Sequence, residues 1–309
     1  MKRVLVTGAS GFIGRHTLAA FLERDFEVHA ASRSRPSGST VANVTWHQVD
    51  LLDERRVPDL VESVQPTHLL HLAWCTEHGK YWSDPANLEW VASSLQLLRA
   101  FHELGGERAV VAGTCAEYDW SGGCCTPATP LRPATLYGAS KHALHQVFDA
   151  YARSASMSAA WGRVFFAYGP GEQPSRVVAT VARGLVRGQP VACSRGVQLR
   201  DFLYVEDVAD AFVALVDSDA GGAFDIGSGE AIPLGKIVLR LGELAGKPEH
   251  VRLGEAPDRD EPYRIVADSP RLREELGWRP TRSLDEGLSR TLDWWREEHD
   301  AAASVRRGR

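Results

Sequence analysis

The chain has 309 residues, of which 44% are hydrophobic and 24% are charged, and its formal net charge is −5. This length and composition allow one large or two small domains with a substantial buried core. Basic residues form a block only at 305–309, so the basic surface of a nucleic-acid-binding protein is missing and no nucleic acid partner is expected.

The first residues lead directly into a strand-like run, and no apolar segment has the length of a secretion signal or a membrane span. We therefore expect a cytoplasmic protein with no membrane partner. The five cysteines are odd in number and lack CxxC spacing, which predicts neither a disulfide framework nor a zinc site, and no metal site is expected.

Short β-branched runs alternate with longer amphipathic segments over the first two-thirds of the chain. This alternation predicts a doubly wound α/β domain of the Rossmann class, with a parallel sheet covered by helices on both faces. Ligands of such sheets bind at the carboxyl ends of the strands. Strands are predicted at 4–7, 27–31, 44–49, 68–73, 108–113 and 158–165, and helices at 12–23, 54–64, 86–104 and 136–154.

The pattern is less regular beyond about Gly169, where glycine and proline are frequent. Helices are predicted there at 175–187, 206–217, 233–245 and 270–276, and the run at 202–205 is expected to return to the first domain. The predicted organisation is a dinucleotide-binding domain at 1–166 that also receives 200–224, a smaller mixed α/β substrate domain at 167–199 and 225–300, and a flexible tail at 301–309.

The first predicted strand ends in a glycine loop, in which Gly8, Gly11 and Gly14 follow G-x-x-G-x-x-G spacing before a helix. Glycines in this position let the backbone approach a pyrophosphate, which the amide groups of the helix N-terminus bind. A tight turn without a ligand is the alternative. The predicted dinucleotide contacts of this loop are Gly8, Ser10, Gly11, Phe12, Ile13 and Gly14.

The second predicted strand ends at Ser32 and Arg33, with no carboxylate before Asp50. An acidic residue in this place binds the adenosine ribose of NAD, whereas an arginine suits the 2′-phosphate of NADP. The sequence therefore favours NADP(H), while NAD(H) stays possible because surface arginines also serve solubility. Further predicted cofactor contacts are Asp50 and Leu51, which could face the adenine, together with Leu72 and Ala73; a helix cap is the alternative role for Asp50.

Tyr137 and Lys141 lie four residues apart at the start of a predicted helix, so they share one face. A nearby ammonium group stabilises a phenolate and is expected to bring the tyrosine pKa towards neutrality, as a general acid or base at a hydroxyl carbon requires. Such pairs are common on helix faces. The strand-end hydroxyl of Thr114 and the glycine loop make the catalytic interpretation the stronger one.

Seven motifs occur in an order that resembles the extended short-chain dehydrogenase/reductases acting on nucleotide-activated sugars, over about residues 1–285. They are TGASGFIG, HLAW, GTCAEY, YGASK, RVFFAYGPG, RDFLYVEDVADA and LGWRP. The resemblance implies that Tyr137 exchanges a proton with a sugar hydroxyl or keto oxygen. Lys141 would hold the nicotinamide ribose and tune the tyrosine. Thr114, four residues before Tyr118, would hydrogen-bond the same sugar oxygen.

The same resemblance assigns nucleotide diphosphate contacts to Arg200 and, with an offset of about one position, to Arg259. It also implies a homodimer through the helices at 86–104 and 136–154. The loop at 73–90 is expected to overhang the nicotinamide. Its candidate sugar contacts are His78, Lys80, Tyr81 and Trp82, with a packed aromatic cluster as the alternative.

Departures from the family pattern limit the reactions that the chain is expected to catalyse. Sugar dehydratases that resemble this chain carry Asp and Glu directly after the threonine, where this chain has Cys115 and Ala116, so dehydration is not expected. Glu117 is expected to face away from Thr114 along an extended strand. Two asparagines usual in the family are replaced by Trp90 and Phe166, which makes the substrate pocket atypical.

The first functional hypothesis is an NAD(P)H-dependent reductase of a nucleotide-linked keto sugar, an NDP-4-keto-6-deoxyhexose 4-ketoreductase. Hydride transfer to a carbonyl needs only the threonine, tyrosine and lysine together with the cofactor. An NAD-dependent NDP-hexose 4-epimerase is the alternative, because it uses the same residues. A non-catalytic dinucleotide or sugar-nucleotide sensor is the hypothesis from another class.

Overall fold

A computed structural model describes residues 2–34, 41–122, 124–126 and 128–307 of the chain. Its centre is a seven-stranded sheet in the order β12-β7-β5-β4-β1-β2-β3, in which every neighbouring pair is parallel. This confirms the predicted doubly wound fold. The strands are β1 Arg3–Thr7, β2 Glu27–Ser32, β3 Val44–Gln48, β4 His68–His71, β5 Arg108–Thr114, β7 Ser158–Val164 and β12 Gly222–Ile226.

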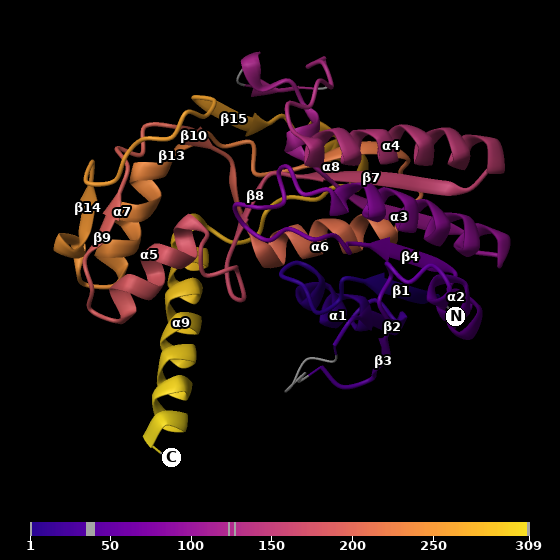
Figure 1. The fold of residues 1–309 in the computed structure, drawn as a ribbon, viewed down its shortest axis with the longest axis horizontal. Helices are drawn as coiled ribbons and strands as arrows, with labels where there is room; N and C mark the ends of the chain where they lie inside the picture. Colours follow the sequence, from indigo (N-terminus) through magenta and orange to yellow (C-terminus); the bar gives the residue numbers. More distant parts are fainter. Residues whose placement is uncertain (1, 35–40, 123, 127, 308–309) are drawn as a thin grey trace.

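Helices cover both faces of the large sheet (Figure 1). On one face Val57, Leu97 and Phe148 bury the apolar sides of three helices against the strands, and on the other face Phe21, Phe212 and Leu272 do the same. The first group consists of α2 Arg56–Val64, α3 Ala86–Glu103 and α4 Leu136–Ala155, and the second of α1 Gly14–Leu22, α6 Val205–Val216 and α8 Pro270–Leu276.

A smaller body lies beside the carboxyl ends of these strands (Figure 1). Its core contains Val178, Leu241 and Leu288, one from each of its three helices. Those helices are α5 Val177–Val186, α7 Leu234–Leu244 and α9 Leu284–Arg307. The strands of this region are β6 Cys124–Cys125, β8 Phe166–Tyr168, β9 Val191–Cys193, β10 Leu199–Arg200, β11 Phe202–Tyr204, β13 Ile232–Pro233, β14 Val251–Leu253 and β15 Arg264–Ala267, with short 3-10 helices at η1 Cys115–Glu117, η2 Trp120–Gly122 and η3 Pro248–His250.

The chain passes between the two bodies more than once. β15 pairs with β10 on one side and with β6 on the other, so residues far apart in sequence close one small sheet. The run at 202–205, expected to return to the first domain, contains β11, which pairs with β8 outside the large sheet. The next helix, α6, packs on α1, and β12 then completes the large sheet. α8 contacts α6 and β12, so it lies with the larger body.

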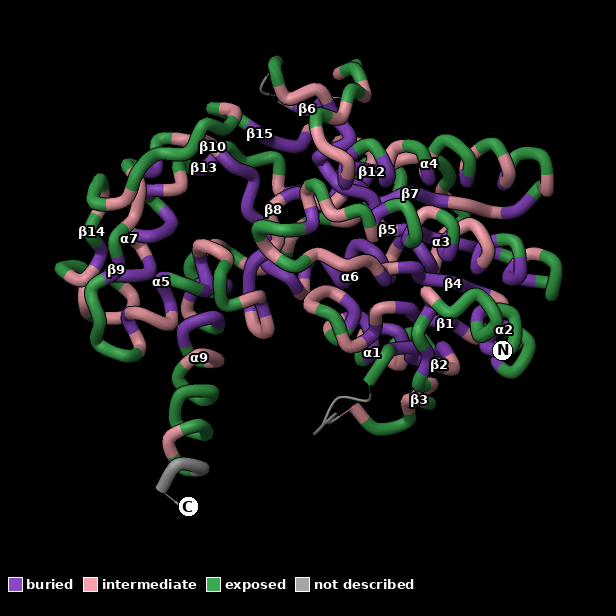
Figure 2. Tube along the Cα trace, in the orientation of Figure 1, coloured by how far each residue is buried: buried purple, intermediate pink, exposed green. Residues whose placement is uncertain are grey.

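Helix α9 is the largest element that the sequence analysis did not predict. Its first half packs on α5 and α7, and its far end extends away from the body and is exposed (Figure 2). It continues to Arg307, so the segment expected to be a flexible tail from residue 301 is helical up to that residue. No helix among the residues that the structure describes is long and apolar enough to cross a membrane.

Candidate active site

A cavity of about 1020 Å³ runs from the glycine loop after β1, past the ends of β4 and β5, to the wall formed by the smaller body. The residues predicted to bind or act are concentrated there. The lining includes Gly8, Ser10, Gly11, Phe12, Ile13, Gly14, Ser32, Arg33, Leu51, Leu72, Ala73, His78, Tyr81, Trp82, Thr114, Tyr137, Lys141, Arg200 and Arg259.

The glycine loop has room for nothing larger than glycine at two positions. Gly8 has φ +68°, and a Cβ there would lie 2.8 Å from the backbone nitrogen of Ala73. A Cβ on Gly14 would lie 2.3 Å from the oxygen of Gly8. Glycine at these positions lets the loop pack tightly against the end of β4 and the start of α1 while it lines the cavity, an arrangement in which helix amides can bind the pyrophosphate of a dinucleotide.

The end of β2 contributes Ser32 and Arg33 to the cavity, and within the described part of the chain no carboxylate from β2 accompanies them in the lining. Leu51 also lines the cavity, but Asp50 does not. The Asp50 carboxylate instead accepts a hydrogen bond from the backbone nitrogen of Leu52 at 3.1 Å and is exposed. A short acidic side chain commonly satisfies its own turn in this way, so the predicted adenine contact of Asp50 is not supported.

Helix α4 places Tyr137 and Lys141 in the cavity wall. The Thr135 side chain caps this helix by accepting a hydrogen bond from the Gly138 backbone nitrogen at 3.1 Å. Lys141 Nζ donates to the backbone oxygen of Ala112 at 2.8 Å and lies 3.9 Å from the centre of the Trp74 ring. Burial lowers the Lys141 pKa to about 7, and the negative charge of Glu117 opposes this effect.

The Tyr137 phenol is buried, and burial is the main reason why its pKa rises well above the ordinary value. The hydroxyl of Thr114 hydrogen-bonds the phenol and works in the opposite direction. The expectation that Lys141 brings the tyrosine pKa towards neutrality is therefore wrong for this structure, because desolvation of the buried phenol is the largest effect on that pKa. Tyr137 is kept in its protonated form, which can donate a proton.

Aromatic rings surround Tyr137. The centres of the Tyr81, Trp82 and Trp74 rings lie 4.8, 5.9 and 6.4 Å from that of Tyr137, each in an edge-to-face arrangement. Tyr81 and Trp82 thus line the cavity and also form the packed cluster that the sequence analysis gave as the alternative. Lys80 points elsewhere: it is exposed and pairs with Glu77 at 2.6 Å, so it does not line the cavity.

Thr114 is the N-cap of the short helix η1. Its hydroxyl oxygen accepts a hydrogen bond from the Ala116 backbone nitrogen at 3.2 Å, and the Glu117 carboxylate accepts one from the Thr114 backbone nitrogen at 2.8 Å. This reciprocal pair is a capping box. The expectation that Glu117 faces away along a strand is wrong, because the chain turns into a 3-10 helix at Cys115. The S/T-x-x-E spacing in GTCAEY was the signal for it.

Cys115 lines the cavity, but burial raises its thiol pKa well above the ordinary value, so it is not an activated nucleophile. Tyr118 is buried away from the cavity and donates to both carboxylate oxygens of Asp225 at 2.9 Å. His71 is buried as expected, with its ring nitrogens 2.7 Å from the Thr7 hydroxyl and 2.9 Å from the Ser94 hydroxyl. These contacts and pKa values give Cys115, Tyr118 and His71 structural roles.

The far end of the cavity carries the two predicted phosphate-binding arginines. Arg200 is 3% exposed, pairs with Glu261 at 2.8 Å and lies 5.5 Å from the centre of the Phe166 ring. Arg259 also lines this end. Trp90 and Phe166, which stand where the family usually has asparagine, both line the cavity, so these departures do alter the pocket wall.

Sequence reasoning missed several lining residues. Trp74 and Trp120 complete the aromatic wall, and Arg176 lies 5.8 Å from the centre of the Tyr81 ring. Glu172 is 6% exposed, and its Oε2 has no hydrogen-bond partner in the part of the chain that the structure describes. Glu172 and Arg176 stand in or just after the turn-rich run YGPGEQP, and the side chain of Gln173 ties that run to the backbone of Thr76 and His78 at the cavity.

The chain is similar to known proteins over nearly its whole length. The model of the NAD dependent epimerase/dehydratase family matches residues 4–227. The structure of UDP-glucose 4-epimerase from Thermus thermophilus in complex with NAD matches with a TM-score of 0.85 and 30% identity, covering 95% of this chain and 99% of that chain.

Two relatives found by sequence carry different names. The dTDP-L-rhamnose 4-epimerase of Burkholderia thailandensis is 27% identical, with 97% of this chain and 96% of the relative covered. The dTDP-glucose 4,6-dehydratase of Haemophilus influenzae is 25% identical, with 96% and 98% covered. The similarity therefore includes both the large sheet and the smaller body.

Proposed function

The chain belongs to the NAD dependent epimerase/dehydratase family, and from that premise we propose that it is an NAD-dependent 4-epimerase of a nucleotide-linked hexose. It is an enzyme of the extended short-chain dehydrogenase/reductase type. One observation carries the proposal. Thr114, Tyr137 and Lys141 share one cavity wall, while Cys115 and Ala116 offer no acid or base for removing water.

The residues of the cavity fit a dinucleotide, because the glycine loop and the start of α1 line one end and the cavity continues past Ser32 and Leu51. When bound, NAD would supply the acceptor for the C4 hydride and its later donor. In its phenolate form Tyr137 would take the proton of the C4 hydroxyl during oxidation, hold it as a phenol while the sugar is in its 4-keto form, and return it to the C4 oxygen during reduction. The Lys141 ammonium would stabilise the phenolate at the start and end of this cycle, against the burial that raises the Tyr137 pKa.

The hydroxyl group of Thr114 can donate a hydrogen bond into the cavity. Its oxygen accepts the Ala116 backbone N–H, so the proton is free to point towards the Tyr137 phenol and a sugar oxygen bound beside it. The aromatic wall of Trp74, Tyr81 and Trp82 offers flat surfaces for the apolar face of a sugar ring and keeps water away. Arg200 and Arg259 lie at the other end, where a diphosphate would bind.

The test is to release any dinucleotide from the purified protein and identify it by mass, then to incubate the protein with UDP-glucose, UDP-glucuronate or dTDP-L-rhamnose. We expect bound NAD and the appearance of a C4 epimer in the proton NMR spectrum without net reduction of NAD. Tyr137→Phe, which should fold normally, should lower the rate by about 10²–10⁴-fold. Absence of any epimer, together with consumption of NADPH by nucleotide-linked 4-keto-6-deoxyhexoses, would contradict the proposal.

The second candidate is the 4-ketoreductase, which two observations favour. Arg33 lines the cavity at the end of β2, and in the described residues of that strand end no carboxylate accompanies it, which suits the 2′-phosphate of NADP. Burial also keeps Tyr137 protonated, the form needed to protonate a keto oxygen. The dinucleotide released from the protein and the NADPH assay distinguish the two candidates. A non-catalytic sensor has less support, because the three catalytic side chains are retained together.

We also propose a homodimer through α3 and α4. These helices pack on each other, and Leu88 on α3 and Val147 on α4 are 62% and 50% exposed. Exposed apolar side chains on two helices that pack on each other support a surface that another chain covers. Analytical ultracentrifugation tests this: Val147→Glu should shift the wild-type dimer to a monomer, whereas a wild-type monomer would contradict the proposal.

A further inference from the structure

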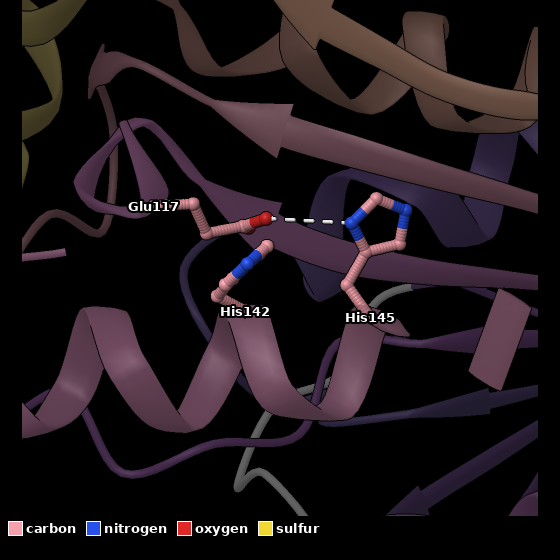
Figure 3. A group of neighbouring side chains, drawn as sticks. All are labelled: Glu117, His142 and His145. Carbon is pink, nitrogen blue, oxygen red and sulfur yellow. Dashed lines mark ion pairs between the residues drawn. The ribbon is translucent and has the colours of Figure 1, made fainter. Parts of the chain in front are cut away.

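Behind Thr114, outside the cavity, lies a buried polar cluster centred on Glu117. His142 and His145 of α4 both point their rings towards this carboxylate (Figure 3), and Glu117 Oε2 lies 3.7 Å from His145 Nδ1. Arg163 of β7 approaches from another side, with its Nε 3.1 Å from Glu117 Oε2. Glu117 is fully buried. Burying a carboxylate costs free energy even when it has several partners, so we expect this group to contribute something in return.

The three side chains of Figure 3 have the spacing of a metal site, since their ligand atoms lie within 4.8 Å of one another. Two observations argue against that role. The Glu117 oxygens already accept hydrogen bonds from Thr114, Trp161 and Arg163. The Arg163 guanidinium also lies 3.4 Å from His145 Nδ1, so a divalent cation would meet a positive charge at contact distance.

The first clue to another role is how Glu117 holds Thr114. Its Oε1 accepts the Thr114 backbone N–H at 2.8 Å and also lies close to the indole nitrogen of Trp161, at 3.0 Å. Gly113 leaves the space for this arrangement, because a Cβ there would lie 2.5 Å from Glu117 Oε1. The backbone on both sides of the Thr114 side chain is thereby fixed, and its hydroxyl with it.

The second clue is the charge of Glu117. The negative charge favours the protonated forms of Lys141 and Tyr137, since it raises the pKa of both groups. Lys141 also faces His71, the Trp74 ring and the oxygen of Ala112. Around Glu117 the other charged or titratable groups are Arg163, His142 and His145, while Asp225 and Tyr118 lie on the far side of Arg163.

We propose that Glu117 is a positioning residue of the active site, which fixes Thr114 through its backbone and places the one buried negative charge of the Glu117, His142 and His145 cluster behind Tyr137 and Lys141. This inference rests on the proposed use of Thr114, Tyr137 and Lys141 in catalysis. Glu117 does not line the cavity, so it acts through these residues and not on the substrate itself.

The direct test is the Lys141 pKa, measured by ¹³C NMR titration of lysine-labelled protein without substrate. In Glu117→Gln the carboxylate charge is lost, so we expect the Lys141 pKa to fall by about one unit. Asp207→Asn is the matched control, because Asp207 is also a buried, hydrogen-bonded acid but holds Thr281 and Arg282 on the opposite side of the sheet. It should leave the Lys141 pKa unchanged.

A second variant separates charge from position. Glu117→Asp keeps the charge but draws the carboxylate back from the Thr114 nitrogen, so it should retain a Lys141 pKa near the wild-type value while kcat falls about 10-fold or more with little change in KM. The kcat of this variant also tests the inference if Glu117→Gln fails to fold. An unchanged Lys141 pKa in Glu117→Gln, or a wild-type kcat in both variants, overturns the inference. The NMR result stands whether or not the protein proves to be an epimerase.

Discussion

The ammonium group of Lys141 lies 3.9 Å from the centre of the Trp74 ring, close enough for a strong cation–π contact. This contact acts together with a hydrogen bond to Ala112 and the negative charge of Glu117, which also favour the charged lysine inside the cavity wall. Burial brings the Lys141 pKa to about 7, so the charge of this group changes near neutral pH. Activity that needs the ammonium form should therefore decline as the pH rises through this value.

Replacing Trp74 should move that decline. Trp74→Leu removes the ring that favours the charged lysine, and the loss of about 1–2 kcal/mol corresponds to a pKa lower by about one unit. The pH dependence of kcat should shift to lower pH by the same amount. Trp120→Leu is the control, because Trp120 lines the same cavity but contacts Trp82 instead of the lysine. Equal profiles for the two variants would show that the cation–π contact is unimportant.

Replacing Arg33 tests the cofactor. If its guanidinium binds a 2′-phosphate, Arg33→Ala should weaken NADPH binding by about 10–100-fold and leave NADH binding nearly unchanged. Dissociation constants from fluorescence titration measure both. Arg55→Ala removes an exposed arginine that does not line the cavity and should have no effect. An unchanged ratio of the two constants would remove the argument for NADP and leave the epimerase with NAD.

Adding one methyl group at Gly113 should disrupt the site. A Cβ there would lie 2.0 Å from the Trp161 indole nitrogen and 2.5 Å from Glu117 Oε1, so Gly113→Ala must displace both groups. We expect a loss of about 2–4 kcal/mol in the free energy of unfolding, measured by urea denaturation. Gly122→Ala is the matched control, since no atom of the described residues lies within 4 Å of its added Cβ. Similar stability of the two variants would contradict the observed packing.

Glu172 should make stability depend on pH. Burial raises its pKa to about 8 in the folded protein from an ordinary value of 4.5. Between these values the folded state binds more protons than the unfolded state, so this group lowers stability as the pH rises from about 4.5 to about 8. Glu172→Gln lacks this penalty. The difference between its thermal midpoint and that of the wild type should grow from about pH 5 to about pH 8. A constant difference would contradict the burial of Glu172, whose Oε2 has no partner among the described residues.

The alternation of apolar runs predicted the strands β1 to β5 and β7 together with helices α1 to α4, because each buried parallel strand is apolar on both faces. Helix α9 was not predicted, because its segment is rich in charged residues. Its fully buried apolar side chains include Leu288 and Leu292, which lie on one side of the helix. The short strands β6, β10, β13 and β15 have two to four residues, too few for a period to be visible.

The site was predictable where a motif carries its own geometry. Gly8, Thr114, Tyr137 and Lys141 meet at one cavity, as their spacing suggested. Glu172, by contrast, lies beside Gln173, whose side chain hydrogen-bonds the backbone of Thr76 and His78, and no local pattern encodes such a contact between distant segments. The roles of Asp50 and Lys80 depended on the direction of a loop side chain. Asp50 accepts a hydrogen bond from Leu52 and Lys80 pairs with Glu77, both outside the cavity lining.

The pairing of β15 between β10 and β6 has a consequence for synthesis of the chain. Ile265 of β15 forms part of the cavity wall, and it joins strands that the ribosome has made long before. A nascent chain that has emerged as far as β12 holds the glycine loop, Tyr137 and Arg200 but lacks the lining residues between Leu234 and Ile265. The large sheet and the glycine loop can therefore form during translation, whereas the cavity wall is completed only after these later residues have been made.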